Sequence, residues 1–223
     1  MTDPKIDRIR MNEFNIPQKF RARKFSNFVP KDEQQRIALG DAQYFVECIH
    51  DRYIEPTRPI ESHPQDLGLI GRGQLFHGTP GSGKTTLAMS TLLEIYYTHS
   101  IRIFAISMAE WIKKKTDQMS LADRKSEQAE QAWWRIYNQL EAVLACPVLL
   151  VDDIGKEYKT SSGYAEAEID NLLRIRNTQA RPTILTSNLP VEAWAKTYGD
   201  SMGSFVHEAF DVIPMSGKDQ RRG

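Results

Sequence analysis

One stretch of the sequence constrains the fold more than any other, namely Gly78-Thr79-Pro80-Gly81-Ser82-Gly83-Lys84-Thr85. It matches the pattern G-x-x-x-x-G-K-[S/T] and lies between an expected strand (74–77) and an expected helix (84–98). Glycines let successive backbone N–H groups turn toward phosphate oxygens, and a helix N-terminus adds partial positive charge at the same place. The alternative, a glycine-rich turn with an incidental lysine, leaves the flanking strand and helix unexplained. The stretch therefore predicts a cradle for a nucleoside triphosphate.

The residues of this stretch have different expected tasks. Lys84 places a positive charge against the β- and γ-phosphates, and the Thr85 hydroxyl ligates Mg²⁺. Backbone N–H groups of the loop and of the first helical turn surround the phosphates. We therefore predict ATP and Mg²⁺ as cofactors, and a nucleotide-binding set made of Gly78, Thr79, Pro80, Gly81, Ser82, Gly83, Lys84, Thr85 and Thr86.

A second element is an apolar run, residues 147–151, that ends in Asp152 and Asp153. A continuous apolar strand is typical of a sheet buried on both faces, and ligands bind outside the carboxyl ends of such strands. We expect Asp152 to hold the magnesium ion and Asp153 to orient or deprotonate the attacking water. The alternative is two acidic residues in a turn.

A third element is the segment 183–188, a short strand that ends in Ser187 and Asn188. The Asn188 side chain is a candidate catalytic group, because an amide there can reach the γ-phosphate or position the water. An Asn-Leu-Pro turn without a catalytic role would have the same sequence.

Short apolar segments alternate with longer helical segments over the chain. The expected strands are 74–77, 101–106, 148–151, 183–186 and 211–213, and the expected helices are 84–98, 108–116, 121–144, 164–180, 191–198 and 201–209. The pairs expected at helix N-termini are Asp32 with Gln35, Ser107 with Glu110, and Ser120 with Asp123. The alternation predicts an α/β fold in which a mostly parallel five-stranded sheet lies between two layers of helices.

Composition excludes several classes of protein. The formal net charge is +0, so nucleic-acid contacts would have to come from local patches of charge. Cys48 and Cys146 do not have the spacing of a metal site or a disulfide framework. No apolar run approaches the roughly 20 residues of a membrane span, and the N-terminus has no secretion signal. We therefore expect a cytoplasmic protein without membrane contact.

Residues 1–30 are polar and basic. Within 1–24 the Lys and Arg residues are 5, 8, 10, 19, 21, 23 and 24, against acidic residues 3, 7 and 13. This composition indicates an N-terminal arm that packs on the rest of the chain, with a disordered tail as the alternative.

The three polar elements, in this order, resemble those of AAA+ ATPases, as Walker A (78–85), Walker B (148–153) and sensor 1 (183–188). More narrowly, the chain is similar to DnaC-type helicase loaders and IstB-type transposition ATPases. The similarity lies in 16–28, in Asp152-Asp153-Ile154-Gly155, in Arg174-Ile175-Arg176, and in an early end about ten residues after the last expected strand. It implies a P-loop AAA+ domain in 31–223 without a C-terminal helical lid. It also implies a terminal arginine, Arg221 or alternatively Arg222, that contacts the phosphates.

The same resemblance implies that residues 108–144 form a helical insert that touches single-stranded DNA. The candidate DNA-binding residues are Lys113, Lys114, Lys115, Arg124 and Lys125, with Trp111, Trp133 and Trp134 near them in sequence. Cations beside aromatic rings suit phosphates and stacked bases. The alternative is that the aromatic residues face the core and that the lysines form a solvated surface.

One position departs from the family. Family members usually carry an arginine that reaches the neighbouring subunit's nucleotide, and Phe205 occupies the corresponding position here. Because an arginine finger neutralises transition-state charge, we expect slow hydrolysis without a partner. Phe205 is either a core residue of the last helix or a contact on a face that a partner covers.

Together these features predict an ATP-hydrolysing replication factor that loads a replicative helicase onto single-stranded DNA. The alternatives are an IstB-type transposition ATPase that selects target DNA, and a nucleotide-gated adaptor that hydrolyses little ATP. A homo-oligomer is compatible with each of them. A small-molecule kinase is disfavoured by the acidic pair and by the polar end of segment 183–188.

Overall fold

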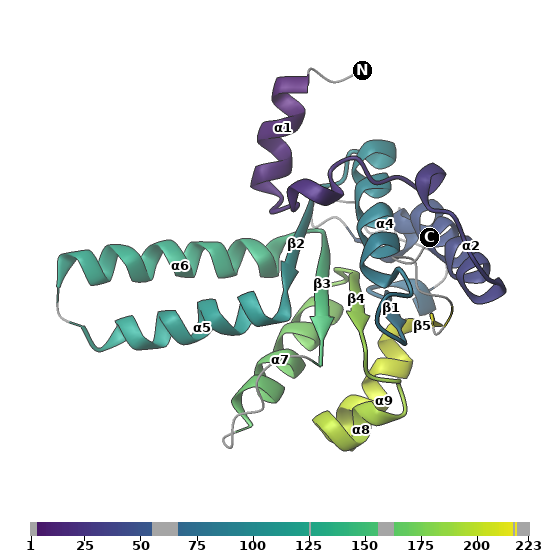
Figure 1. The fold of residues 1–223 in the computed structure, drawn as a ribbon. Helices are drawn as coiled ribbons and strands as arrows, with labels where there is room; N and C mark the ends of the chain where they lie inside the picture. The colour runs from purple at the N-terminus through teal and green to yellow at the C-terminus, as the bar shows by residue number, and fades with distance from the viewer. Residues whose placement is uncertain (1–3, 55–66, 125, 156–162, 216, 218–223) are drawn as a thin grey trace.

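The computed structural model describes residues 4–54, 67–124, 126–155, 163–215 and 217. Its centre is one five-stranded sheet in the order β2-β3-β4-β1-β5, in which every neighbouring pair is parallel (Figure 1). The strands are β1 (Gly73–His77), β2 (Ile103–Ser107), β3 (Val148–Ile154), β4 (Thr183–Ser187) and β5 (Phe210–Pro214). The predicted α/β architecture is confirmed, and the sheet is parallel throughout.

Helices cover both faces of the sheet (Figure 1). The first face packs against α2 (Glu33–Glu47) and α4 (Lys84–His99), and the second packs against α5 (Met108–Ala122), α7 (Tyr164–Thr178) and α9 (Asp200–Ala209). Alternate strand residues enter the two cores, so that Leu150 lies in the first and Leu149 in the second. The remaining helices are α1 (Pro4–Glu13), α3 (Ile49–Arg52), α6 (Glu127–Ala145) and α8 (Ala193–Tyr198), with 3-10 turns η1 (Gln18–Phe20), η2 (Phe25–Asn27) and η4 (Leu67–Leu69).

The described N-terminal residues pack on the domain. The guanidinium of Arg10 donates to the Tyr96 hydroxyl at 2.7 Å, and the Phe14 ring meets the Tyr96 ring edge-on at 5.0 Å. Ala105 N–H, on the edge strand β2, donates to the Phe14 carbonyl at 3.0 Å. The arm therefore covers part of an otherwise open sheet edge while it buries its own apolar residues Met11, Phe14, Ile16, Phe20 and Phe28.

Helices α5 and α6 form a long antiparallel hairpin that projects from the β2 edge (Figure 1). Ser107 caps α5 as predicted, because its hydroxyl accepts from Glu110 N–H at 3.1 Å. The predicted cap at Ser120 is wrong: Ser120 lies inside α5 and its hydroxyl donates to the Asp117 carbonyl. The cap of α6 is Ser126, which accepts from Ala129 N–H at 3.2 Å. The second helix therefore starts at Glu127, later than the predicted residue 121.

No helix in the described ranges combines the length and the apolar character that crossing a membrane requires.

Candidate nucleotide-binding site

The glycine-rich loop leads from β1 directly into α4. Gly83, the residue before the helix, has φ 93°, a left-handed conformation that costs glycine little. Lys84 follows it and is only 6% exposed. Its Nζ donates to the carbonyls of Gly78 at 2.9 Å and Thr79 at 2.7 Å, and it lies 3.4 Å from the Ser82 hydroxyl. A buried ammonium group needs such acceptors, and they hold the cation at the centre of the loop.

A hydrogen bond joins the start of α4, just after the loop, to the acidic strand. The Thr85 hydroxyl on α4 donates to Oδ1 of Asp152 on β3 at 2.8 Å. These two side chains come from positions far apart in the sequence, and the parallel sheet brings them to the same edge. A hydroxyl oxygen and a carboxylate oxygen are hard ligands of the kind that Mg²⁺ selects, so the pair fits the predicted metal.

Strand β3 is irregular where its carboxylates lie. Its register with β4 shifts between Val151 and Ile154, and Asp153 has φ 62°. Thr186 of β4 bridges the break, because its hydroxyl accepts from Asp153 N–H at 2.9 Å and donates to Asp152 Oδ1 at 2.6 Å. An irregularity of this kind re-aims side chains. Here both carboxylates line the same pocket.

A second link joins the ends of β3 and β4. The Ser187 hydroxyl donates to the Ile154 carbonyl at 2.9 Å and accepts from Leu189 N–H at 3.0 Å. Gly155 has φ 94°, and a Cβ added there would lie 2.7 Å from Leu189 Cγ. The close approach of these two loops therefore requires glycine at 155, and it places Asn188 beside the pocket.

These groups surround a cavity of about 470 Å³. Its wall on the domain side is formed by Pro80, Gly81, Gly83, Lys84, Thr85, Thr86, Asp152, Asp153 and Asn188. The remaining predicted loop residues, Gly78, Thr79 and Ser82, supply the acceptors around Lys84. A cavity with a buried cation, backbone N–H groups at a helix N-terminus and paired carboxylates fits a nucleoside triphosphate with its metal.

The opposite wall comes from the N-terminal arm and was not predicted. Its lining residues are Lys19, Phe20, Arg23, Asn27, Phe28 and Val29. The charge count of the arm is visible in the sequence, but its fold against α4 depends on distant contacts. One of these is the hydrogen bond from Phe25 N–H to the Glu94 carboxylate at 3.2 Å. Thr186 was missed for a similar reason, since its role depends on the irregularity in β3.

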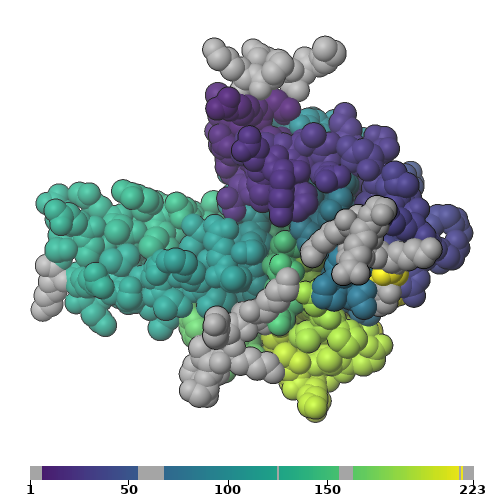
Figure 2. All heavy atoms as spheres, in the orientation of Figure 1, coloured from purple at the N-terminus to yellow at the C-terminus, as the bar shows by residue number. Residues whose placement is uncertain are grey.

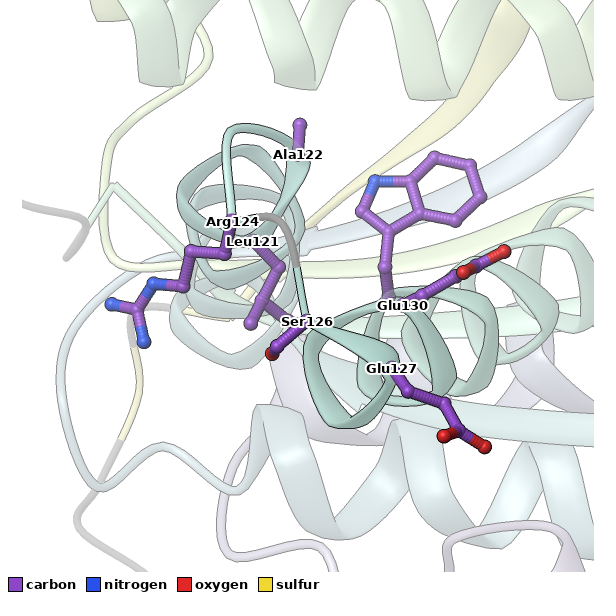
Figure 3. A pocket seen from close by; sticks show the side chains of 7 residues that line it. Leu121, Ala122, Arg124, Ser126, Glu127 and Glu130 are labelled. Atoms are coloured by element: carbon purple, nitrogen blue, oxygen red, sulfur yellow. The ribbon is translucent and has the colours of Figure 1, made fainter.

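The predicted DNA-binding cations lie on the hairpin, away from this cavity. Each lysine of the run is close to a carboxylate: Lys113 to Asp117 at 2.5 Å, Lys114 to Glu110 at 3.6 Å, and Lys115 to Glu168 at 3.3 Å. Arg124 is exposed and lines a hollow of about 600 Å³ at the hairpin turn, between Leu121 and Trp133 (Figure 3). Lys125 and Arg221 fall outside the described residues.

The described arginines near the last helices have structural partners. Arg176 is fully buried, and its guanidinium donates to carbonyls that include Val143, Cys146 and Pro182. Burial lowers the pKa of Arg176 to about 9. Arg174 pairs with Asp170 at 2.7 Å and lies over the Phe205 ring, 4.5 Å from its centroid.

Phe205 itself is 7% exposed and meets the Phe210 ring edge-on at 6.1 Å. The interpretation of Phe205 as a core residue is therefore confirmed.

Comparisons with known proteins agree with this geometry. The family described as "IstB-like ATP binding protein" matches residues 74–204, more than half of the 223-residue chain. No curated protein matches the chain. The solved structure of the DnaC helicase loader superposes with a TM-score of 0.67 at 22% identity, covering 90% of this chain and 100% of that one. DnaI gives 0.64 at 18% identity, covering 92% and 94%.

A more distant structure is the replication initiator DnaA bound to AMPPCP and single-stranded DNA. It has a TM-score of 0.60 at 14% identity, and the match covers 91% of this chain and 51% of that one. At these identities the three structures share the fold, while the family match extends through the glycine-rich loop, the acidic pair and Asn188. The chain belongs to the IstB-like ATP-binding proteins.

Proposed function

We propose that this protein binds and hydrolyses ATP with Mg²⁺ and uses the cycle to load a replicative helicase onto single-stranded DNA. One observation carries the enzymatic part of the proposal. The Thr85 hydroxyl, the Asp152 carboxylate, the Thr186 hydroxyl and the backbone N–H of Asp153 form one hydrogen-bonded chain beside the buried ammonium of Lys84. Such a chain fixes the Asp152 carboxylate and the backbone of Asp153 beside the place where a γ-phosphate bound by the loop would lie.

Each residue has a proposed task. Lys84 exchanges its loop carbonyls for phosphate oxygens, and Thr85 with Asp152 holds the metal, which neutralises charge on the phosphates. Asp153 accepts a proton from the attacking water, and Asn188 orients that water. The left-handed backbone at Asp153 and its hydrogen bond to Thr186 direct this carboxylate separately from its neighbour, which supports a division of tasks between them.

The loader role rests on coarser support. The chain covers the full length of the solved DnaC helicase loader and nearly all of DnaI. Phe205 is buried, so the helix that would carry an arginine finger presents none at that position. We propose that a partner supplies this cation in trans, which makes the protein a slow ATPase until it meets the helicase.

The test is a helicase-loading assay with the replicative helicase of the same organism. The expected result is that the protein with ATP accelerates unwinding of a fork coated with single-strand-binding protein. Lys84→Ala, which removes the cation of the cradle, should abolish that acceleration. Unwinding that is identical with and without the wild-type protein would contradict the loader role, whatever its ATPase rate.

A second candidate is a transposition ATPase that selects target DNA, and the match to the IstB-like family favours it. This role needs duplex DNA and a transposase rather than a single strand and a helicase. ATPase rates measured with equal masses of single-stranded and duplex DNA separate the two candidates. Stimulation by duplex alone would favour the transposition role.

The third candidate, a nucleotide-gated adaptor, is favoured by the buried Phe205. An adaptor of this kind would bind ATP as tightly as an active ATPase does. It would not hydrolyse ATP even when helicase and single-stranded DNA are both present.

A further inference from the structure

A groove of about 500 Å³ lies on the β2 edge of the sheet, between the end of α1 and the base of the α5–α6 hairpin. Figure 2 shows the purple N-terminal segment standing over the base of the teal hairpin at this place. The groove is separate in its lining from the nucleotide-binding cavity. Its side chains are mostly cationic or amide: Arg102, Lys114, Arg135, Asn138 and Gln139, with Phe104 on the strand.

Two cations of this groove differ from the lysine run on α5. Arg102 and Arg135 are exposed, and neither forms an ion pair with any residue that the structure describes. Lys114 also lines the groove, but it donates to Gln139 at 2.8 Å and lies 3.6 Å from Glu110. A phosphate that approaches Arg102 or Arg135 therefore meets a guanidinium group without displacing a carboxylate.

Helix α6 separates this basic surface from an acidic one. At 3.6 residues per turn, Arg135, Asn138 and Gln139 share the side of α6 that lines the groove. The neighbouring side carries Glu130 and Glu141, together with the half-exposed Trp134. Trp133, which contacts the rings of Trp134 and Tyr137, shares its hollow with Glu127 and Glu130 as well as with Arg124, so that two carboxylates there oppose the attraction of one cation for a phosphate backbone.

We propose that the single-stranded DNA of the proposed function lies in the β2-edge groove rather than on the lysine run or the aromatic cluster. Arg102 and Arg135 contact phosphates, while Phe104 and the amides of Asn138 and Gln139 face the bases. This inference rests on the proposed function and names the surface that it uses. Glu13 and Glu110 also line the groove and oppose the strand by like charge, although Lys114 lies 3.6 Å from Glu110 and offsets its charge.

The test is equilibrium binding of a fluorescein-labelled oligothymidylate, followed by anisotropy across a range of KCl concentrations with AMPPCP and Mg²⁺ present. For Arg102→Ala/Arg135→Ala we expect weaker binding and a log–log salt slope reduced by about 1.4, since each single-strand phosphate contact contributes about 0.7. Glu13→Gln should tighten binding. Lys113→Ala, at a side chain that is 71% exposed and paired with Asp117, is the matched control and should bind like the wild type.

All four side chains are exposed, so thermal unfolding and nucleotide affinity should stay at wild-type values in every variant. If the double variant kept the wild-type DNA affinity and salt slope, the groove would not be the DNA-binding site, and the loader function would be unaffected. The same conclusion would follow from a wild-type protein that prefers an oligoglutamate peptide to oligothymidylate, since the groove would then bind protein. A wild-type protein that binds no single strand even at low salt would instead overturn the DNA part of the proposed function.

Discussion

The candidate nucleotide-binding cavity and the helical hairpin differ in how their charged side chains are held. In the cavity, Lys84 is nearly buried and its acceptors belong to the loop that carries it. On the hairpin, Lys113 is 71% exposed and pairs with Asp117 one turn away on the same helix. An exposed pair of this kind contributes little, about 0.3–0.5 kcal/mol, and is easily exchanged. A buried cation without its partners would be far more costly.

This difference shows where a single substitution can act. The cavity contains few charged and polar side chains, and hydrogen bonds hold them in place. Removing one of them should therefore change ATP binding or hydrolysis strongly. On the hairpin, the exposed pair of Lys113 and Asp117 lies on a solvated surface, so that losing Lys113 should have a small effect.

Lys84→Ala should weaken ATP binding by about 10² to 10⁴-fold. The estimate assumes two charge-assisted hydrogen bonds to phosphate at about 1.5–3 kcal/mol each. Titration with a fluorescent ATP analogue measures the affinity, and Lys113→Ala is the control for loss of an exposed lysine. If Lys84→Ala kept the wild-type affinity, the cradle would not be the nucleotide site.

Asp153→Asn should leave ATP bound and reduce turnover on the order of 10²-fold, because an amide cannot accept the proton from water. Asparagine tolerates the left-handed backbone at this position, so the variant should fold normally. Asp152→Asn should instead weaken the binding that depends on Mg²⁺, since this carboxylate faces Thr85. Equal loss of nucleotide affinity in both variants would show that the two carboxylates do not divide the tasks.

The sequence predicts the cavity better than the hairpin for a physical reason. The glycine-rich loop carries its own geometry, because Gly83 and the start of α4 are consecutive in the chain. Apolar strands that end in polar residues must then place those residues at one edge of a parallel sheet. Thus the loop, Asp152, Asp153 and Asn188 can be predicted, and the structure places them around one pocket.

What the sequence did not predict depends on contacts between distant segments. Ser120 and Ser126 are both plausible caps, and the length of α5 decides between them. Arg176 belongs to a segment that carries the family resemblance, and the structure shows it buried against carbonyls of the α6–β3 connection. The sequence shows that Arg135 and Glu130 lie on different sides of α6. It does not show which side lines a groove, because that depends on where α1 packs.

Thr186→Val should raise KM for MgATP and lower kcat together, by about 5- to 30-fold in kcat/KM. The estimate takes about 1–2 kcal/mol for the lost hydrogen bonds to Asp152 and to Asp153 N–H. Valine keeps the volume and the β-branch, so the strand should be preserved. Thr186→Ser, which restores the hydroxyl, should recover most of the activity. A valine variant with wild-type kinetics would mean that the bridge across β3 does not position the carboxylates.

The smallest expected effect is that of the protein's own concentration on its ATPase rate. Phe205 packs against Phe210 in the core, and Arg174 and Arg176 are held by Asp170 and by backbone carbonyls. None of these three residues can reach a neighbouring subunit's nucleotide without breaking contacts in its own chain. The turnover per molecule should therefore stay constant as the protein is concentrated.

Adding the helicase should change this result, because a cation supplied in trans can raise the rate of phosphoryl transfer by about 10³ to 10⁵-fold in the GTPase case. The measurement is the steady-state rate per molecule across a wide range of protein concentration, with and without helicase. The variant Arg174→Ala removes an arginine whose side chain is 38% exposed and which could therefore be offered to a neighbouring subunit. A steep cooperative rise with the protein alone, abolished by Arg174→Ala, would identify Arg174 as a finger and contradict the need for a partner. A constant rate for the protein alone, combined with a higher rate when helicase is added, would support a cation supplied in trans.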